Sequence, residues 1–452
     1  MAFDVVNKRV MVVGGGRSGI AAAELLAERG ARVTLADANG LPDEAGRLQQ
    51  LGVSFAPGAH EAQQFASSDL IVLSPGVPPQ QSAIDAARRA GVPVIGEVEL
   101  ASRWLSGRVI AITGTKGKST TTTLTARMLA EAGFDAPAGG NLGQALSAQV
   151  AASQSQTLHV VEVSSFQLET TDTFHPWIAV LLNLSPDHLD RHATFEDYRA
   201  AKGRIFANQA DSDWAVVNAD DRAAVDLARH ARARRFDFAL QAPIDEGVTV
   251  EGPAIVRRQS GAAAPLLPLA AVKLPGRHLL SDVLAAAAVG CLAGVPPAAM
   301  QRAVEGFSGL EHALEPAGEV RGVRFINDSK ATNIASALKS LESFDDDVVA
   351  IMGGRFKGGR FEDLREAVSE RVSAIVAIGE AAPLIHTAFD DLVPVHDGLS
   401  MSDAVQTAYA AARSGGVVVL APGCSSFDMF RDYAERGRMF KEAVAQLERA
   451  GR

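Results

Sequence analysis

Short apolar runs alternate with helix-like segments in three successive series along the chain. In the first series, residues 9–13 and 31–37 have the pattern of strands, and residues 19–30 have the pattern of the helix between them. Residues 69–78 begin as an apolar strand and end in a loop rich in proline and glycine. Alternation of strands with helices predicts β-α-β units around a parallel sheet.

The second series begins at the apolar strand of residues 108–114 and continues into a helix over residues 119–132. Two further apolar runs, residues 158–165 and 177–185, predict strands of the same sheet. Residues 242–270 have an irregular pattern with four prolines, which fits either a small β insertion or a loop. Residues 273–294 then predict a turn followed by a long alanine-rich helix.

The third series follows residues 323–333. Three short apolar runs, flanked by helix-like segments, predict further strands: residues 348–354, 373–380 and 415–423. Each run ends at a glycine or at a glycine followed by a glutamate. An amphipathic helix is predicted over residues 438–449.

The chain of 452 residues has room for about three domains of ordinary size. We therefore predict an α/β protein with boundaries near residues 97 and 308. Residues 1–97 form a Rossmann-like domain, residues 98–308 a central domain with a parallel sheet like that of P-loop ATPases, and residues 309–452 a second Rossmann-like domain.

The net charge of −10 lacks the basic excess that nucleic acids or anionic membranes require in a partner. Two cysteines, Cys291 and Cys424, cannot build a disulfide framework or a zinc site. The N-terminus lacks a cleavage-site pattern, and the uncharged stretch at residues 283–300 contains two prolines that make it a poor membrane span. We expect a cytoplasmic monomer that binds neither nucleic acid nor membrane.

The first motif with chemical meaning is GGGRSG, residues 14–19, between a predicted strand and a predicted helix. Asp37 ends the next strand, at roughly the spacing of an acid that binds a ribose. Alone, the motif fits a nicotinamide-dependent oxidoreductase, or only a tight strand–helix turn. It indicates a phosphorylated ligand at a helix N-terminus more securely than it indicates NAD.

The second motif is GTKGKST, between the strand of residues 108–113 and a helix. Main-chain N–H groups of such a loop cradle phosphates, the lysine before the serine supplies a positive charge, and the serine can bind Mg²⁺. An oxidoreductase leaves this loop without a purpose. The candidate ATP-binding residues are Gly114, Thr115, Lys116, Gly117, Lys118, Ser119 and Thr120.

This short phosphate loop resembles that of the Mur ligases and the related folylpolyglutamate synthetases. Further motifs extend the resemblance to the Mur ligases along nearly the whole chain: VVEVSSFQLE, NLSPDHLDRH and YRAAKGRIF in the central part, and FINDSKATN and LAPGCSSFD near the C-terminus. Within the family, the last two resemble the pair typical of the members that add D-glutamate. The absence of a D-N-P-R motif opposes a sibling member that adds a diamino acid or dipeptide.

The resemblance implies a metal site for two Mg²⁺ ions, with ligands from the loop and the following strands: Ser119, Glu162, His188 and Lys202. In the family the lysine is carbamylated by CO2, which replaces a positive charge by an oxygen ligand. One carboxylate, a hydroxyl and phosphate oxygens suit Mg²⁺, which keeps several waters. From the residues alone, His188 fits an exposed loop histidine equally well, and Lys202 fits a solvated helix lysine.

The resemblance also assigns substrate-binding and catalytic residues. GGGRSG would then hold a UDP diphosphate and not NAD. Catalytic roles fall to Lys118, His188, Lys202, Asp328 and Lys330. Contacts with UDP-N-acetylmuramoyl-L-alanine fall to Gly15, Gly16, Arg17, Ser18, Asp37, Ser74, Pro75, Gly76, Asn141 and His188. Contacts with D-glutamate fall to Thr332, Lys357, Ser426, Phe427 and Tyr433.

The implied activity is the ATP-dependent formation of an amide bond through an acyl phosphate, in cytoplasmic peptidoglycan precursor synthesis. Domains 1–97, 98–308 and 309–452 would bind the UDP-substrate, ATP and the amino acid. Two departures favour an alternative, a degenerate nucleotide-binding module. The family pattern G-x-H-N-x-x-N has Leu279 and Asp282 in place of its two asparagines, and Ala313 replaces an arginine, for which Arg321 or Arg324 could substitute.

Overall fold

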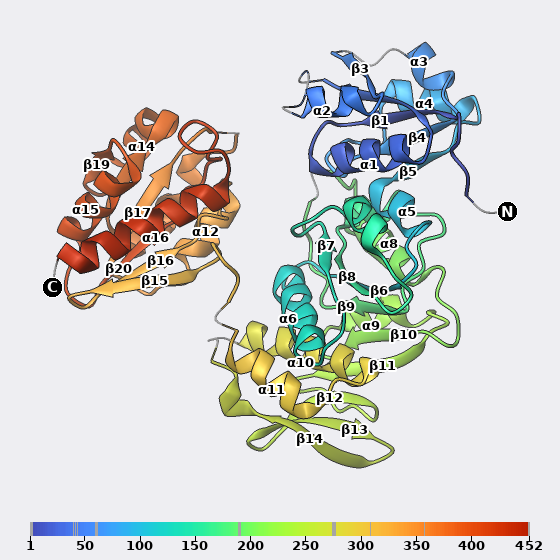
Figure 1. The fold of residues 1–452 in the computed structure, drawn as a ribbon. Coiled ribbons are helices and arrows are strands. Elements are labelled where there is room, and N and C mark those ends of the chain that lie inside the picture. Colours follow the sequence, from blue (N-terminus) through green and yellow to red (C-terminus); the bar gives the residue numbers. More distant parts are fainter. Residues whose placement is uncertain are drawn as a thin grey trace. The chain divides into compact units, whose positions relative to one another are not determined.

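The computed structural model describes residues 3–38, 40, 42, 44–58, 62–188, 191–273, 277–307, 309–356 and 358–450. The chain divides into two compact units, residues 1–307 and 308–452, and each is described by itself (Figure 1). The first unit contains two sheets and the second unit contains one.

The first sheet has five parallel strands in the order β3-β2-β1-β4-β5. Its strands are β1 (Arg9–Val13), β2 (Arg32–Asp37), β3 (Ser54–Pro57), β4 (Leu70–Leu73) and β5 (Val94–Gly96). Its helices are α1 (Arg17–Glu28), α2 (Ala45–Gln50), α3 (Ala62–Ala66) and α4 (Ser82–Arg89), and α5 (Glu97–Ser102) follows. The predicted strands at 9–13, 31–37 and 69–78 and the helix at 19–30 are confirmed. The sequence pattern does not predict β3 and β5, which are short.

The second sheet has nine strands in the order β14-β13-β12-β11-β10-β9-β6-β8-β7. The strands from β7 to β12 are paired in parallel: β6 (Arg108–Thr113), β7 (Ala138–Gly140), β8 (Leu158–Glu162), β9 (Ile178–Leu181), β10 (Trp214–Asn218), β11 (Arg234–Ala239) and β12 (Gly247–Glu251). Two antiparallel strands, β13 (Ala254–Gln259) and β14 (Ala262–Pro268), extend the edge. The segment 242–270 is therefore a β insertion rather than a loop.

Helices of the second sheet include α6 (Lys118–Glu131), α7 (Ser165–Leu168), α8 (Phe195–Gly203), α9 (Arg222–Ala228), α10 (Arg277–Ala293) and α11 (Pro297–Glu305). The uncharged run of α10 is buried, with residues 283–289 at most 1% exposed, and this helix packs against α6. Burial in a protein core explains the apolar composition of the helix. No helix among the described residues is both long enough and apolar enough to cross a membrane.

The third sheet, in residues 308–452, has the strand order β15-β16-β20-β17-β18-β19. Its strands are β15 (Glu315–Val320), β16 (Val323–Asn327), β17 (Val348–Gly353), β18 (Val372–Ile378), β19 (Val395–Gly398) and β20 (Val417–Leu420), and only β15 is antiparallel to its neighbour. Its helices are α12 (Ile334–Leu341), α13 (Arg365–Arg371), α14 (Ala382–Phe389), α15 (Met401–Ala411) and α16 (Tyr433–Ala450). Helix α16 begins five residues before the predicted start at residue 438.

Three α/β sheets confirm the predicted fold class. The strands that carry chemistry are parallel, so their carboxyl ends meet at one edge of each sheet. The exact boundaries at residues 97 and 308 stay predictions.

Candidate functional site

The phosphate loop, residues 114–120, connects strand β6 to the 14-residue helix α6. Gly117 caps the helix with a left-handed φ of 83°, and a Cβ at this position would lie 2.1 Å from Oδ1 of Asp282. Glycine is therefore required there both by the backbone conformation and by the space. The loop ends at the N-terminus of a long helix, where main-chain N–H groups and the helix dipole favour an anion.

Two lysines approach this loop from different elements. Lys118, the first residue of α6, donates hydrogen bonds to the carbonyls of Gly114 and Thr115 (3.0 and 2.9 Å). Lys202 of α8 donates to the Gly114 carbonyl (2.8 Å) and is 1% exposed. Burial, with a smaller contribution from the charge of Lys118, lowers the pKa of Lys202 to about 7. The neutral amine is thus accessible at physiological pH.

Side chains of neighbouring strands hold the loop in shape. The amide of Asn183 accepts from the Lys116 N–H (2.8 Å) and donates to the Lys116 carbonyl (3.1 Å). The hydroxyl of Thr115 accepts from the Ser185 N–H (3.0 Å) and shares a hydrogen bond with the hydroxyl of Tyr198 (3.0 Å). The sequence analysis missed Asn183 and Tyr198 as supports, although both lie in motifs that it quoted.

Glu162 ends strand β8 and is 2% exposed. Its Oε2 accepts from the hydroxyl of Ser119 (2.7 Å), and its Oε1 accepts from the amide of Asn141 (2.8 Å). A carboxylate and a hydroxyl within one hydrogen bond of each other, at a phosphate loop, are the hard oxygen donors that Mg²⁺ prefers. The donor set therefore fits the predicted metal, with Ser119 and Glu162 as its protein ligands.

His188 has a left-handed backbone (φ 54°), and its side chain is 48% exposed. Its ring packs against Phe166, with the centroids 4.9 Å apart. Tyr198 lies 6.5 Å from that ring and 4.7 Å from Nζ of Lys202. The ring of His188 and Nζ of Lys202 therefore lie in one neighbourhood, around the ring of Tyr198.

A cavity of about 420 Å³ lies within the first unit, where the carboxyl ends of β1, β2 and β4 face residues of the central part. It brings together most of the residues predicted to contact the UDP-substrate: Gly16, Arg17, Ser18, Asp37, Ser74, Pro75, Gly76 and Asn141. Gly15 stands behind this lining, and its N–H donates to the carboxylate of Asp37 (2.5 Å). The predicted contact His188 does not line the cavity.

Residues that the sequence analysis did not single out complete this cavity. Gln167, 3% exposed, lines it from helix α7, and Gly143 accepts a hydrogen bond from the guanidinium of Arg17 through its carbonyl (3.1 Å). Close packing fixes the first glycine loop, because a Cβ on Gly19 would lie 1.8 Å from the Gly14 carbonyl oxygen. The contact between Arg17 and Gly143 could not be predicted from sequence, because 126 residues separate them.

In the second unit, Asp328, Lys330 and Thr332 lie on the loop that follows β16. The Asp328 carboxylate, which is 9% exposed, accepts from the N–H of Leu314 (3.2 Å), and burial raises the pKa of this carboxyl group. The N–H of Lys330 donates to the carbonyl of His312 (2.9 Å). One hydrogen bond to a side chain and one between main-chain groups therefore tie this loop to the segment that leads into β15.

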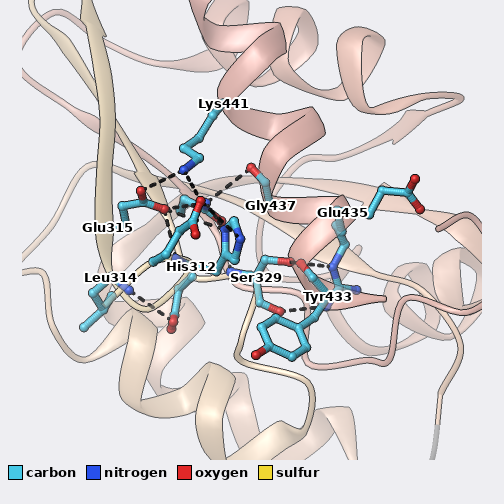
Figure 2. A network of polar contacts seen from close by, with 12 residues as sticks. His312, Leu314, Glu315, Ser329, Tyr433, Glu435, Gly437 and Lys441 are labelled. Atoms are coloured by element: carbon cyan, nitrogen blue, oxygen red, sulfur yellow. Dashed lines mark hydrogen bonds and ion pairs between the residues drawn. The ribbon is translucent and has the colours of Figure 1, made fainter. Parts of the chain in front are cut away.

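The described residues predicted to contact D-glutamate come from three places in the same unit, one of which is Thr332 on the loop after β16. Ser426 and Phe427 follow β20; Ser426 is 2% exposed and Phe427 is 57% exposed. Tyr433 begins α16, and its carbonyl accepts from the hydroxyl of Ser329 (2.7 Å), as Figure 2 shows. Lys357 lies outside the described residues. The structure brings Tyr433 beside the 328–332 loop.

The departures from the family pattern have distinct surroundings. Asp282 is 5% exposed beneath Gly117, and burial raises its pKa to about 8. Leu279 lies one turn earlier on α10. The suggestion that Arg321 or Arg324 replaces an arginine at position 313 stays a prediction. Arg324 lies in β16, and Arg321 lies in the turn before that strand.

Three family models match successive parts of the chain. The Mur ligase MurD-like N-terminal domain matches residues 8–96, the Mur ligase middle domain matches residues 112–290, and the Mur ligase glutamate ligase domain matches residues 314–424. Each model corresponds to one of the three sheets, and only the first four residues of β6 lie outside the matched ranges.

Curated relatives match over nearly their whole length. UDP-N-acetylmuramoylalanine–D-glutamate ligase of Acidobacterium capsulatum is 45% identical over 447 residues, which is 98% of this chain and 97% of the relative. The protein of the same name from Koribacter versatilis is 42% identical over 448 residues, 98% of this chain and 99% of the relative.

Solved structures share the fold at lower identity. UDP-N-acetylmuramate-alanine ligase MurC of Thermotoga maritima is 18% identical, has a TM-score of 0.59 and covers 97% of this chain with 100% of its own. A pseudomurein peptide ligase type C of Methanothermus fervidus is 16% identical, has a TM-score of 0.55 and covers 98% of this chain with 100% of its own. At these identities the likeness shows the fold alone.

Proposed function

Because this chain belongs to the Mur ligase family, we propose that it is the ATP-dependent ligase that joins D-glutamate to UDP-N-acetylmuramoyl-L-alanine in peptidoglycan precursor synthesis. The observation that carries the proposal is identity of 42–45% to curated D-glutamate ligases over almost the full length of both chains. The arrangement of the phosphate loop and of the cavity between the first two sheets supports it.

The reaction must first activate a carboxylate, which is a poor electrophile. The substrate carboxylate attacks the γ-phosphorus of ATP, ADP leaves, and an acyl phosphate forms. The amine of D-glutamate then attacks the acyl carbon, the resulting tetrahedral species loses inorganic phosphate, and the amine loses a proton. Each turnover therefore yields one amide, one ADP and one phosphate.

Lys118 is suited to the phosphoryl-transfer step. Its ammonium group lies within the phosphate loop, held by the carbonyls of Gly114 and Thr115, where it can exchange these acceptors for phosphate oxygens. A positive charge that is already in place stabilises the charge that spreads over the transferring phosphoryl group. Lys330, on the second unit, has the same proposed role, and Asp328 beside it is proposed to orient the nucleotide.

Ser119 and Glu162 would hold Mg²⁺, which neutralises phosphate charge when it is bound. We propose a second Mg²⁺ with ligands from His188 and from Lys202 as its carbamate. An ammonium cannot bind a cation, so the unmodified lysine does not fit this role. The lowered pKa of Lys202 supports the modification, because only the neutral amine reacts with CO2.

The cavity lined by Arg17, Ser18 and Asp37 is proposed to bind the UDP portion of the substrate. Its size suits part of such a ligand, since small-molecule sites are typically about 300–1,000 Å³. Thr332, Lys357, Ser426, Phe427 and Tyr433 are proposed to contact D-glutamate. We further propose that the protein acts as a cytoplasmic monomer.

A degenerate binding module is the second candidate, because Asp282 places a carboxyl group beneath the phosphate loop and Ala313 lacks a cationic side chain. Phosphate release from Mg-ATP separates the two. With UDP-N-acetylmuramoyl-L-alanine and D-glutamate both present, the ligase releases phosphate. It releases none when either is omitted, or when L-glutamate or diaminopimelate replaces D-glutamate. ATP binding without any release would establish the module instead.

A further inference from the structure

Arg436 on helix α16 is the largest fully buried side chain among the described residues, with 0% exposure. Burial lowers its pKa to about 10, which leaves the guanidinium charged at neutral pH. Taking a guanidinium out of water is strongly unfavourable unless its donors are satisfied. The hydrogen-bond acceptors of Arg436 therefore indicate why the charge is tolerated.

The acceptors are neutral oxygen atoms. Nε donates to the hydroxyl of Ser329 (2.9 Å), and Nη2 donates to the carbonyl of the same residue (2.9 Å). Nη1 donates to the carbonyl of Cys424 (3.1 Å) and, at 3.5 Å, approaches that of Gly353. Within the described part of the chain, no carboxylate forms an ion pair with Arg436. Asp428 acts on it only through space, while accepting the N–H of Glu380 (2.9 Å).

These acceptors belong to three different loops at one edge of the sheet. Ser329 follows β16, Gly353 ends β17, and Cys424 follows β20. The three strands are adjacent and parallel, so their carboxyl ends meet where open α/β sheets bind ligands. One planar guanidinium thus bridges the three loops.

The fit around this bridge is tight. A Cβ on Gly354 would lie 2.2 Å from the Ser425 carbonyl oxygen and 3.2 Å from Nη1 of Arg436. The hydroxyl of Ser329 also donates to the carbonyl of Tyr433, so the start of α16 is tied to the same point (Figure 2). An apolar residue of similar volume could fill the space, but it could not set the spacing of three main-chain carbonyls.

We propose that Arg436 is a positioning residue for the amino-acid substrate: it fixes the three strand-end loops at the spacing that binding D-glutamate requires. The inference rests on the proposed function, because the loops it bridges carry or adjoin Thr332, Ser426 and Tyr433. Arg436 is too deeply buried to touch the substrate and acts through these loops.

The test compares Arg436→Met and Arg436→Lys with Arg438→Met in the phosphate-release assay. Arg438 lies two residues further along α16 and is exposed, so its variant loses the same charge without disturbing the bridge. We expect both Arg436 variants to raise the KM for D-glutamate about 10- to 100-fold. The KM for UDP-N-acetylmuramoyl-L-alanine stays unchanged, because the cavity proposed for it lies wholly in residues 1–307. Arg438→Met behaves as the wild type.

Arg436→Lys distinguishes bridging from charge. A lysine keeps the positive charge but cannot span three loops, so positioning predicts a defect close to that of Arg436→Met. Ser329→Ala provides a milder variant if the others fold poorly. It removes the hydroxyl that accepts from Nε, and we expect a rise of about three- to tenfold in the same KM.

Three results would overturn the inference. The first is an unchanged KM for D-glutamate in Arg436 variants whose melting temperature alone is lowered. The second is a wild-type KM for D-glutamate in Arg436→Lys. The third is a rise in this KM in Arg438→Met as large as that in Arg436→Met. The wild type is measured first. If its phosphate release does not depend on D-glutamate, the proposed function fails. Dependence on D-glutamate with an unchanged KM in the variants removes only the role of Arg436.

Discussion

Lys118 and Lys202 donate hydrogen bonds to the same acceptor, the carbonyl oxygen of Gly114, at 3.0 and 2.8 Å. Burial, with a smaller contribution from the charge of Lys118, lowers the pKa of Lys202 to about 7. In its neutral form the Lys202 amine carries no charge and can act as a nucleophile. This pairing is the structural basis for the proposed carbamate.

Replacing Lys202 by arginine keeps a cation but removes the amine that reacts with CO2. We expect Lys202→Arg to lose at least about 100-fold in the rate of phosphate release. In NMR spectra recorded with ¹³C-labelled bicarbonate, the wild type gives a carbamate signal that the variant lacks. Lys339→Arg, at an exposed position of α12, serves as the control and keeps both the activity and the signal. A wild type that gives no such signal would remove the carbamate from the mechanism.

Asp282 gives a pH-dependent prediction for stability. Its folded-state pKa, raised by burial to about 8, lies above its unfolded value, so the folded protein binds more protons than the unfolded chain between about pH 4 and 8. The contribution of Asp282 to the free energy of unfolding therefore falls as pH rises through that window, and it is constant above the window. Asparagine does not titrate, so the Asp282→Asn variant lacks this pH-dependent contribution. We expect Asp282→Asn to melt above the wild type, by a margin that widens from pH 5 to pH 8. A constant margin would contradict the assigned burial effect.

The UDP cavity makes a prediction about substrate selectivity. Arg17 lines that cavity and donates a hydrogen bond to the Gly143 carbonyl, whereas the phosphate loop, the proposed ATP site, lies elsewhere on the same unit. We expect Arg17→Met to raise the KM for UDP-N-acetylmuramoyl-L-alanine about tenfold or more while the KM for ATP stays within twofold. Arg47→Met on helix α2 removes an exposed charge outside the cavity and serves as the control. Equal changes in both KM values would place Arg17 outside the UDP site.

The phosphate loop follows from sequence because it depends on local pattern, whereas the spatial order of the strands in its sheet depends on long-range pairing. A β-strand, a loop with two glycines and two lysines, and a helix are contiguous between residues 108 and 131. The residues that support the site depend instead on contacts between segments far apart in the sequence. Arg436 reaches Ser329 across 107 residues, and its neighbours in sequence give no sign that it is buried. On a helix with mostly exposed charges, an arginine is predicted to be solvated, and only the packing of α16 on the sheet reverses this.

The strand β15 was missed for a related reason. Its sequence, EPAGEV, contains proline, glycine and two acids, all of which are uncommon in strands. It forms at the edge of the sheet, where pairing with β16 alone is needed and a bulge near residues 316–318 accommodates the proline and glycine. The non-local hydrogen bonds between β15 and β16 therefore override the low strand propensity of this sequence.

Gly437 and His312 show how such packing can be tested. Gly437 lies within α16, where alanine normally stabilises a helix by about 1 kcal/mol relative to glycine. A Cβ there would lie 2.2 Å from Nδ1 of His312. The ring of His312 is 3% exposed, and its Nδ1 forms a hydrogen bond with the side-chain amide nitrogen of Asn327 (2.9 Å). We expect Gly437→Ala to lower the melting temperature despite its better helix propensity. Gly46→Ala on α2 is the matched control, because no atom lies within 4 Å of a Cβ there, and it should be neutral or slightly stabilising. A stabilised Gly437→Ala would show that His312 yields without cost, and the contact between α16 and the segment before β15 would then not constrain the fold.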